Sequence, residues 1–327
     1  MTRDIFKLNA AAVMIVLANA SMALAQAVPD DDRHLGAGTH ELRLNVDNHA
    51  RSYLVHIPRG YDSRTPVPVV IMLHGGGGTG RAALRETGWA RKADLEGFLA
   101  VFPNALARDP SRRSHFSRNP QLWNDGSDRF YADQKVVDDV RFIDALLDDV
   151  SARFAVDAKR IFVTGFSNGA SMSFRLGMER SHRIAAIAPV AGALWLKSFT
   201  LQRPVPMHYI TGTADPLNPI EGGVPKLASG GSDPVRAKPK PPVRDSVVKW
   251  ARALGCAPIP MRESEANGVR TQTFCDREQV VYVAVNDLGH TWAGGKSLLP
   301  ERMVGKTSRK ISATDVIWDF FRKHATQ

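Results

Sequence analysis

Residues 160–180 read R-I-F-V-T-G-F-S-N-G-A-S-M-S-F-R-L-G-M-E-R. The β-branched and aromatic run that opens this stretch predicts a buried strand, and the residues from Asn168 onward predict a helix. Between the two, G-F-S-N-G leaves room only for a tight turn, in which small residues must flank the central serine. Gly165 and Gly169 supply that room because they lack a Cβ atom. The stretch therefore predicts a strand–turn–helix unit with Ser167 at the turn.

The position of Ser167 favours a chemical role. A serine at the tip of such a turn stands at the N-terminus of the following helix, where the helix dipole favours developing negative charge. The G-x-S-x-G pattern between a strand and a helix is the context that a nucleophile elbow requires. A glycine-rich turn without a chemical role is the alternative interpretation.

Strands and helices alternate on both sides of this unit. Residues 39–47 and 51–57 each alternate apolar and polar side chains, which predicts an antiparallel pair at the start of the sheet. Continuous apolar runs predict further strands at 67–73, 98–102, 184–190, 205–211 and 279–285. Amphipathic patterns predict helices at 81–96, 136–154, 168–180, 243–254 and 312–324. This order predicts an α/β fold with a mostly parallel central sheet flanked by helices.

Two later residues complete a candidate set with Ser167. A serine hydroxyl is a weak nucleophile at neutral pH and needs a base. Asp215 follows strand 205–211 and His290 follows the last predicted strand, so both should lie at the carboxyl edge of the sheet. The chain order serine, acid, histidine is that of the α/β-hydrolases. We expect these residues to act as nucleophile, acid and base; Asp287 is the rival acid, and an ordinary turn aspartate and loop histidine are the alternatives.

An oxyanion hole requires two backbone N–H donors. The N–H of Asn168, directly after the serine, is one candidate. The run H-G-G-G-G at 74–78 follows the third predicted strand, and its glycines let the backbone approach a substrate closely. We expect Gly75 or Gly76 to provide the second donor. A phosphate-binding loop is the alternative, but no G-K-[ST] sequence follows.

Together these segments resemble the polyhydroxybutyrate-depolymerase-like esterase family, which is related to secreted feruloyl and acetylxylan esterases. The matching pieces are L-H-G-G-G-G, V-D-D-V-R-F-I-D, G-F-S-N-G-A-S-M, G-T-A-D-P-L-N-P-I-E-G-G, G-H-T-W-A-G-G and A-T-D-V-I-W-D-F-F. They span about residues 40–324. The resemblance implies a serine esterase that hydrolyses carboxylic esters through an acyl-enzyme without a cofactor, with Ser167, Asp215 and His290 as its catalytic residues.

The chain has two cysteines, Cys256 and Cys275. A lone pair in an exported protein is typical of one disulfide, and two free thiols are the alternative. The resemblance also implies this bridge, because L-G-C and T-F-C stand where relatives carry bridged cysteines. Two cysteines cannot form a zinc site alone, and no histidine cluster in the sequence has metal-ligand spacing.

The first residues have the features of a secretory signal. Two basic residues precede an apolar run at 10–18, and A-L-A at 23–25 matches a cleavage pattern. The run is too short to span a bilayer, which needs about 20 apolar residues, and a buried N-terminal helix is the alternative. We expect a secreted or periplasmic protein without a membrane span, organised as a signal peptide at 1–25, a flexible lead-in at 26–38 and a catalytic domain at 39–327.

The formal net charge of the chain is +10. Arginines and lysines gather in three loops expected at the carboxyl edge of the sheet, at 104–130, 226–244 and 296–310. A positively charged surface around the expected site predicts anionic esters, or an anionic polymer or surface, as partners. Solvated loops without a binding role are the alternative. The sequence contains neither a recognition helix nor a basic motif interleaved with aromatic residues. We therefore do not expect binding to nucleic acid.

Two tryptophans are candidates for substrate binding. Trp123 lies in a predicted loop and Trp292 comes two residues after His290, and an aromatic acyl group can stack on such side chains. Core packing is the alternative for both. We expect feruloyl or acetyl esters, or soluble hydroxyalkanoate oligomers, as substrates. An acyltransferase with the same three residues and a non-catalytic envelope-binding protein are the alternative functions.

Overall fold

The computed structural model describes residues 35–128, 137–198, 200–226 and 238–325. The predicted signal peptide and most of the predicted lead-in lie outside the described residues, as do parts of the first two basic loops. No helix in the described ranges is long and apolar enough to cross a membrane.

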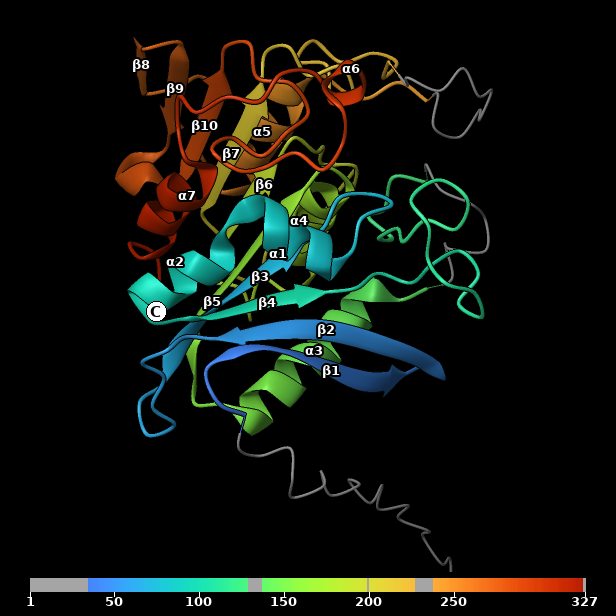
Figure 1. Ribbon diagram of the computed structural model, residues 1–327. Coiled ribbons are helices and arrows are strands. Elements are labelled where there is room, and N and C mark those ends of the chain that lie inside the picture. Colours follow the sequence, from blue (N-terminus) through green and yellow to red (C-terminus); the bar gives the residue numbers. More distant parts are fainter. Residues whose placement is uncertain (1–34, 129–136, 199, 227–237, 326–327) are drawn as a thin grey trace, which may run out of the picture. The chain divides into compact units, whose positions relative to one another are not determined.

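One large sheet forms the centre of the described chain (Figure 1). Its spatial order is β1-β2-β4-β3-β5-β6-β7-β10-β9-β8. The strands are β1 (Gly38–Val46), β2 (His49–Ile57), β3 (Val67–Leu73), β4 (Leu99–Pro103), β5 (Val156–Phe166), β6 (Ala186–Val190), β7 (Met207–Gly212), β8 (Arg262–Ala266), β9 (Val269–Phe274) and β10 (Val280–Val285). The strands from β4 to β10 in this spatial order pair in parallel, and the pairs β1–β2, β2–β4, β10–β9 and β9–β8 are antiparallel. The predicted mostly parallel sheet with antiparallel N-terminal strands is confirmed.

Helices cover both faces of the sheet. They are α1 (Gly80–Thr87), α2 (Trp89–Glu96), α3 (Asp139–Arg153), α4 (Asn168–Glu179), α5 (Val243–Ala253), α6 (Glu301–Val304) and α7 (Ala313–Phe321). Figure 1 shows α1, α2 and α7 in front of the sheet, with α3, α4 and α5 behind it. Alternate residues of β3 supply the two cores: Val69 and Ile71 pack with the helices behind, and Val70 and Met72 pack with those in front. A strand covered on both faces needs the continuous apolar sequence seen there.

Two local features differ from the prediction. The single helix expected at 81–96 is two helices, because Gly88 between α1 and α2 adopts a left-handed φ of 75°. The hairpin of β8 and β9 was not predicted. Asn267 and Gly268 form its turn with φ values of 52° and 70°, the conformation that an Asn-Gly pair favours between antiparallel strands. β8 is the outermost strand at this end of the sheet, and all its side chains are exposed.

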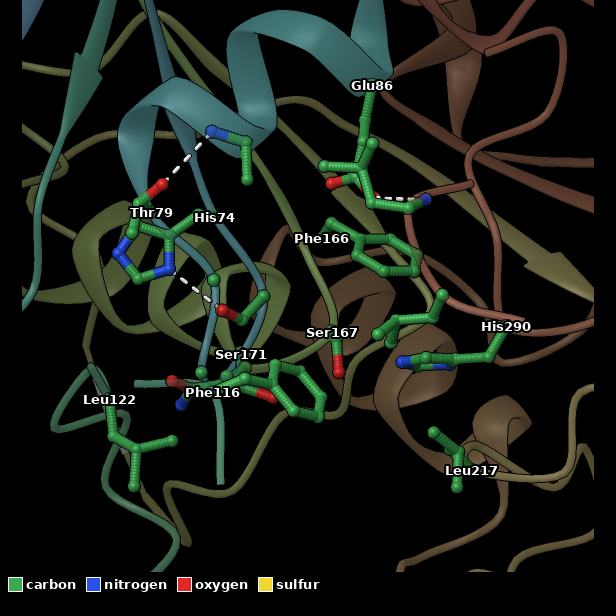
Figure 2. A pocket seen from close by; sticks show the side chains of 18 of the residues that line it. His74, Thr79, Glu86, Phe116, Leu122, Phe166, Ser167, Ser171, Leu217 and His290 are labelled. Carbon is green, nitrogen blue, oxygen red and sulfur yellow. Dashed lines mark hydrogen bonds between the residues drawn. The ribbon is translucent and has the colours of Figure 1, made fainter. Parts of the chain in front are cut away.

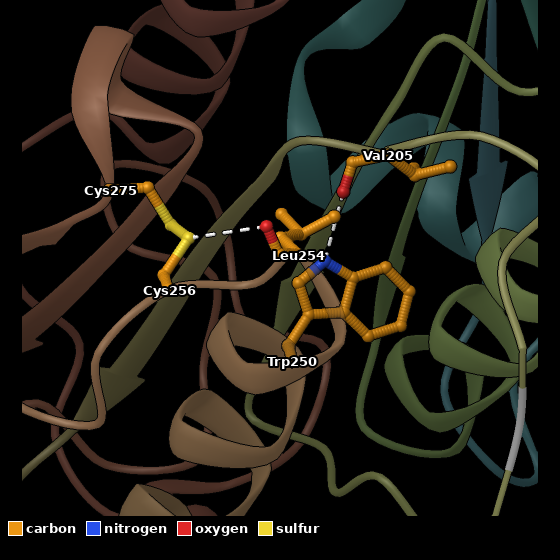
Figure 3. Close-up of a disulfide and its surroundings, with 5 residues drawn as sticks. All are labelled: Val205, Trp250, Leu254, Cys256 and Cys275. Carbon is orange, nitrogen blue, oxygen red and sulfur yellow. Dashed lines mark hydrogen bonds between the residues drawn. A yellow bond between two sulfur atoms is a disulfide. The ribbon is translucent and has the colours of Figure 1, made fainter.

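The disulfide predicted between Cys256 and Cys275 is present in the structure, with its Cα atoms 5.3 Å apart. It joins the segment after α5 to the end of β9 (Figure 3). Beside it, the indole N–H of the buried Trp250 donates to the carbonyl oxygen of Val205 at 2.9 Å. The bridge thus fixes α5 to the antiparallel end of the sheet.

Replacing both cysteines by serine should lower the free energy of unfolding by about 3 kcal/mol, because the bridge closes a loop of roughly 20 residues in the unfolded chain. Urea unfolding of the double variant measures this loss. The kcat for a small ester should stay unchanged in the folded range, because neither cysteine lines the pocket described below. An unchanged unfolding midpoint would contradict the stabilising role.

Candidate active site

The turn between β5 and α4 is strained at Ser167. This residue has φ 56° and ψ −116°, a conformation that costs a non-glycine residue of the order of 1–3 kcal/mol. Its backbone N–H donates to the carbonyl oxygen of Val190 at 2.9 Å. A Cβ atom at Gly165 would lie 2.2 Å from the carbonyl oxygen of Gly169, and one at Gly169 would lie 2.3 Å from that of Leu73. The flanking glycines are therefore required by close backbone approach on both sides of the turn.

A third glycine supports the same turn, and the sequence pattern did not identify it. A Cβ atom at Gly192 would lie 2.6 Å from the carbonyl oxygen of Ser167 and 2.6 Å from the Cβ of Ala170. Gly192 follows β6, a neighbour of β5 in the sheet. Gly192 contacts the turn only because β5 and β6 pair in the sheet, so no local sequence motif predicts this contact.

Asp215 and His290 are joined by a buried hydrogen bond. They follow β7 and β10, which are parallel neighbours in the sheet. The imidazole Nδ1 lies 2.7 Å from Oδ2 of Asp215, and both residues are 5% exposed. A carboxylate only accepts, so Nδ1 carries the proton and Nε2 is left as the acceptor.

Other contacts keep Asp215 ionised. Its Oδ1 accepts from the backbone N–H groups of Leu217 at 2.8 Å and Asn218 at 2.7 Å. Burial by itself raises the pKa of this carboxyl, but the charge and hydrogen bond of His290, the nearby Lys240 and the backbone N–H outweigh it, so the pKa is lowered. Asp287, the rival acid, has an 84% exposed side chain that lies 3.4 Å from Lys310.

Ser167 and His290 line one pocket with a volume of about 360 Å³. The ring of Phe166, the residue before the serine, packs on the His290 ring with their centroids 4.7 Å apart. Figure 2 shows the serine hydroxyl beside the imidazole, with Phe166 above and Leu217 below. The structure therefore brings together the three residues that the sequence singled out, from the ends of three strands.

The glycine run lies directly against the turn. A Cβ atom at Gly75 would lie 3.5 Å from the Cβ of Ser167, and one at Gly76 would lie 3.6 Å from the Cβ of Asn168. The N–H groups of Gly77 and Gly78 donate within the fold, at 2.8 Å to Gln121 and 2.9 Å to Gly75. Among the described residues, no partner accepts from the N–H of Gly75 or Gly76. Those two donors are the ones that remain for a ligand.

His74 holds this run in place. Its Nε2 accepts from the backbone N–H of Ala105 at 3.1 Å, so the proton must be on Nδ1, which lies 2.8 Å from the carbonyl oxygen of Gly75. Complete burial lowers the pKa of His74 to about 4. The side chain is therefore neutral and positions the glycine run. Protonation of Nε2 would place its N–H against the N–H of Ala105, and the hydrogen bond between them would be lost.

The side chain of Asn168 fixes the loop that packs against the glycine run, a role that sequence reasoning missed. Its Oδ1 accepts from the N–H of Trp123 at 2.8 Å, and its Nδ2 donates to the carbonyl oxygen of Trp123 at 3.0 Å and to Asp125 at 2.9 Å. Farther out, the buried Asp139 accepts from the N–H of Asn124 at 2.7 Å and from Arg51 at 2.6 Å. The backbone of the loop is thus held at consecutive residues.

The structure contradicts the predicted contact of Trp123 and Trp292 with substrate. Trp123 is fully buried, and its indole N–H donates to the carbonyl oxygen of His74 at 3.0 Å. Trp292 is 3% exposed and donates to the hydroxyl of Thr314 at 3.0 Å. Neither indole lines the pocket that holds Ser167. Both are structural residues, because each has its single N–H donor satisfied inside the fold.

The lining of the pocket is mostly apolar. It includes Phe116, Leu122, Phe166, Leu217, Pro225, Leu298 and Leu299. All three of the predicted basic loops contribute lining residues, so their position at this edge of the sheet is confirmed. Lys240 is the only lysine or arginine among the described lining residues, and its Nζ donates to Asn218 at 3.0 Å. The described residues contain no group of three or more His, Cys, Asp or Glu placed to hold a metal ion.

The Phospholipase/Carboxylesterase family model matches residues 61–225, which is half of the chain. The chain belongs to this family. The chain is 28% identical over 321 residues to "Putative esterase NocK" of Nocardia uniformis subsp. tsuyamanensis, and the match covers 93% of this chain and 88% of that protein. It is 27% identical over 254 residues to feruloyl esterase B of Piromyces equi, covering 75% of this chain and 44% of that protein.

Solved structures share the fold of the carboxylesterase. The acetyl xylan esterase from Aspergillus awamori superposes with a TM-score of 0.55 at 14% identity, covering 77% of this chain and 94% of that one. A thermostable esterase superposes with a TM-score of 0.50 at 13% identity, covering 88% and 63% of the two chains. Because the chain belongs to this family and is similar to esterases, it is a carboxylic ester hydrolase of the α/β-hydrolase fold.

Gly169→Ala should destabilise the carboxylesterase by more than about 2 kcal/mol, because the added methyl group meets a backbone oxygen that cannot move aside. Gly60→Ala is the matched control, since a Cβ atom there meets nothing within 4 Å. Thermal unfolding of both variants measures the difference. Equal melting temperatures for the two would contradict the close approach at the turn.

The low pKa of His74 makes the stability of the carboxylesterase depend on pH. The unfolded chain binds the proton near pH 6.5 and the folded chain binds it only at about 4, so stability falls as the pH drops between these values. This residue should contribute a loss of about 3 kcal/mol over that range. Urea unfolding at several pH values should give a flatter pH dependence for His74→Gln than for the wild type. Parallel pH profiles would contradict the assignment.

Proposed function

We propose that this carboxylic ester hydrolase works through an acyl-enzyme formed on Ser167, with His290 as its general base and Asp215 as the acid that orients the base. The observation that carries the proposal is the buried 2.7 Å hydrogen bond between His290 and Asp215, beside a strained serine in one pocket. This combination supports the roles of nucleophile, base and orienting carboxylate.

The proposed reaction has two steps. His290 Nε2 removes the hydroxyl proton of Ser167 as Oγ attacks the ester carbonyl carbon, and it then donates that proton to the departing alkoxide as the carbon–oxygen bond breaks. A water molecule next gives a proton to His290 as its oxygen attacks the acyl carbon. His290 returns that proton to Oγ of Ser167 as the bond between the acyl carbon and Oγ breaks and the acid leaves. Asp215 stays ionised throughout and stabilises the imidazolium, in keeping with its lowered pKa.

The developing oxyanion would be stabilised by backbone donors. The N–H of Asn168 starts α4 and has no acceptor within the helix, as expected of a first-turn residue. The N–H groups of Gly75 and Gly76 lie against the same turn and lack a partner among the described residues. Fixed donors of this kind are commonly worth a factor of about 10² to 10³ in kcat.

Pocket size and polarity support small or aromatic acyl groups. A volume of about 360 Å³ is near the lower end of the usual range for ligand pockets. The side chains of Phe116, Leu122 and Leu217 offer apolar surface to such a group. Relatives named feruloyl esterase and acetyl xylan esterase carry those acyl groups in their names. We therefore propose feruloyl or acetyl esters of polysaccharides, with soluble hydroxyalkanoate oligomers as the next class to test.

The disulfide supports a location outside the cytosol. Such bridges persist in oxidising compartments and are rare where glutathione and thioredoxin keep thiols reduced. The bridge between Cys256 and Cys275 would therefore persist in a secreted or periplasmic protein.

Replacement of the catalytic residues tests the proposed mechanism. Ser167→Ala and His290→Ala should each lower kcat on a p-nitrophenyl ester by about 10⁴-fold or more, because each removes a group without which no acyl-enzyme forms. Stopped assays on p-nitrophenyl, feruloyl, acetylxylan and hydroxybutyrate-oligomer esters measure activity and rank the substrates. Circular dichroism shows whether the variants are folded. A folded Ser167→Ala variant with wild-type turnover would refute the mechanism, and acyl transfer to an added sugar would identify an acyltransferase.

A further inference from the structure

A second hollow, of about 450 Å³, lies in the loop between β4 and α3, outside the pocket of Ser167. Four arginines line it, namely Arg108, Arg112, Arg113 and Arg118, and all four are exposed. Figure 1 shows this loop projecting beyond the carboxyl end of β4. We call this hollow the arginine pocket.

The buried Asn119 builds the arginine pocket. Its side chain is inside the loop, where Oδ1 accepts from the N–H of Asp109 at 2.8 Å. Its Nδ2 donates to the carbonyl oxygens of Asp109 at 2.9 Å, Arg112 at 3.2 Å and Arg113 at 3.3 Å. The backbone of Asn119 also pairs in both directions with that of His115, at 2.9 and 3.1 Å. The backbone that carries the arginines is therefore fixed before any ligand binds, which reduces the entropy lost on binding.

The described lining of the arginine pocket carries more positive than negative charge. Among the described lining residues Asp109 is the only acidic one, and its carboxylate already pairs with Arg112 at 3.2 Å. Among the described residues, no carboxylate lies within ion-pair distance of Arg113 or Arg118. Crowded like charges repel each other, and a bound anion relieves this repulsion. Guanidinium groups form two parallel hydrogen bonds with a carboxylate, which makes arginine well suited to that anion.

One loop contributes lining residues to both the arginine pocket and the pocket of Ser167. Phe116 lies between arginines of the same loop and lines the pocket of Ser167. The loop is also joined to the glycine run, since the N–H of Gly77 donates to Gln121 at 2.8 Å, and a Cβ atom at Gly77 would lie 2.7 Å from the carbonyl oxygen of Phe116. A chain-like substrate with its ester beside Ser167 can therefore extend along this loop toward the arginine pocket.

We propose that the arginine pocket binds a carboxylate group of an acidic polysaccharide whose esterified sugar occupies the neighbouring pocket. This inference rests on the proposed ester hydrolysis at Ser167 and specifies its substrate class. An acidic polysaccharide carries carboxylates at regular intervals along a hydrated chain, so one ester and one carboxylate can be held at the same time. Anchoring at the second pocket lowers KM for such a chain and leaves small esters unaffected.

The test compares two triple variants with equal loss of charge. Arg112→Gln, Arg113→Gln and Arg118→Gln are combined in the first. The control combines Arg43→Gln, Arg59→Gln and Arg252→Gln, three exposed arginines that line neither pocket. The probes are acetylated oligogalacturonides, acetylated xylo-oligosaccharides as neutral chains of equal length, and p-nitrophenyl acetate. Values of kcat and KM are measured from about 20 mM to about 500 mM NaCl, a range over which charge screening changes strongly.

The first variant should lose about tenfold or more in kcat/KM on the acidic chain at low salt, through KM, and should match the wild type on the two neutral probes. The control variant should keep the wild-type kcat/KM on all three. An equal loss in both variants, or equal KM values for acidic and neutral chains in the wild type, would overturn the proposal. Displacement of the acidic chain by millimolar inorganic phosphate with no preference for longer oligomers would also overturn it, because it indicates a small-anion site. Absence of turnover on p-nitrophenyl acetate would instead count against the proposed function.

Discussion

The close approach of three backbone segments around Ser167 is the constraint on which the rest of the structure depends. The start of α4 lies so near β5 and the end of β3 that no Cβ atom fits at Gly165 or Gly169. This packing over-determines the turn, so the left-handed φ of Ser167 persists although it is unfavourable in isolation. The serine side chain is consequently held out of the sheet, in the same pocket as His290, which follows β10.

Parallel strand order then brings Asp215 and His290 together. β7 and β10 are neighbours in register, so the residues that follow them, Asp215 and His290, meet without any long-range adjustment of the chain. The glycine run after β3 reaches the same edge and is kept there by the neutral His74. Specificity depends on different parts of the molecule, because the loops around this fixed centre supply nearly all the apolar lining.

Sequence patterns predicted most of the regular elements and singled out Ser167, Asp215 and His290, which the structure brings together, because both leave local signals. The buried strands are continuous apolar runs, and the elbow has flanking glycines. The break at Gly88 was missed because one glycine in an amphipathic run does not reveal its φ. The β8–β9 hairpin was missed although its Asn-Gly turn is a recognised signal. The roles of Trp123 and Trp292 could not be predicted, since side-chain direction depends on partners such as His74 and Thr314 that only the fold brings near.

The outermost strand β8 has a consequence for behaviour in solution. Its sequence R-E-S-E-A places both signs of charge along an unpaired row of backbone donors and acceptors. Exposed sheet edges of this kind invite pairing with a second chain, and charged side chains oppose it because they would have to be desolvated or brought against like charges. The hairpin therefore terminates the sheet with a strand that resists edge-to-edge aggregation.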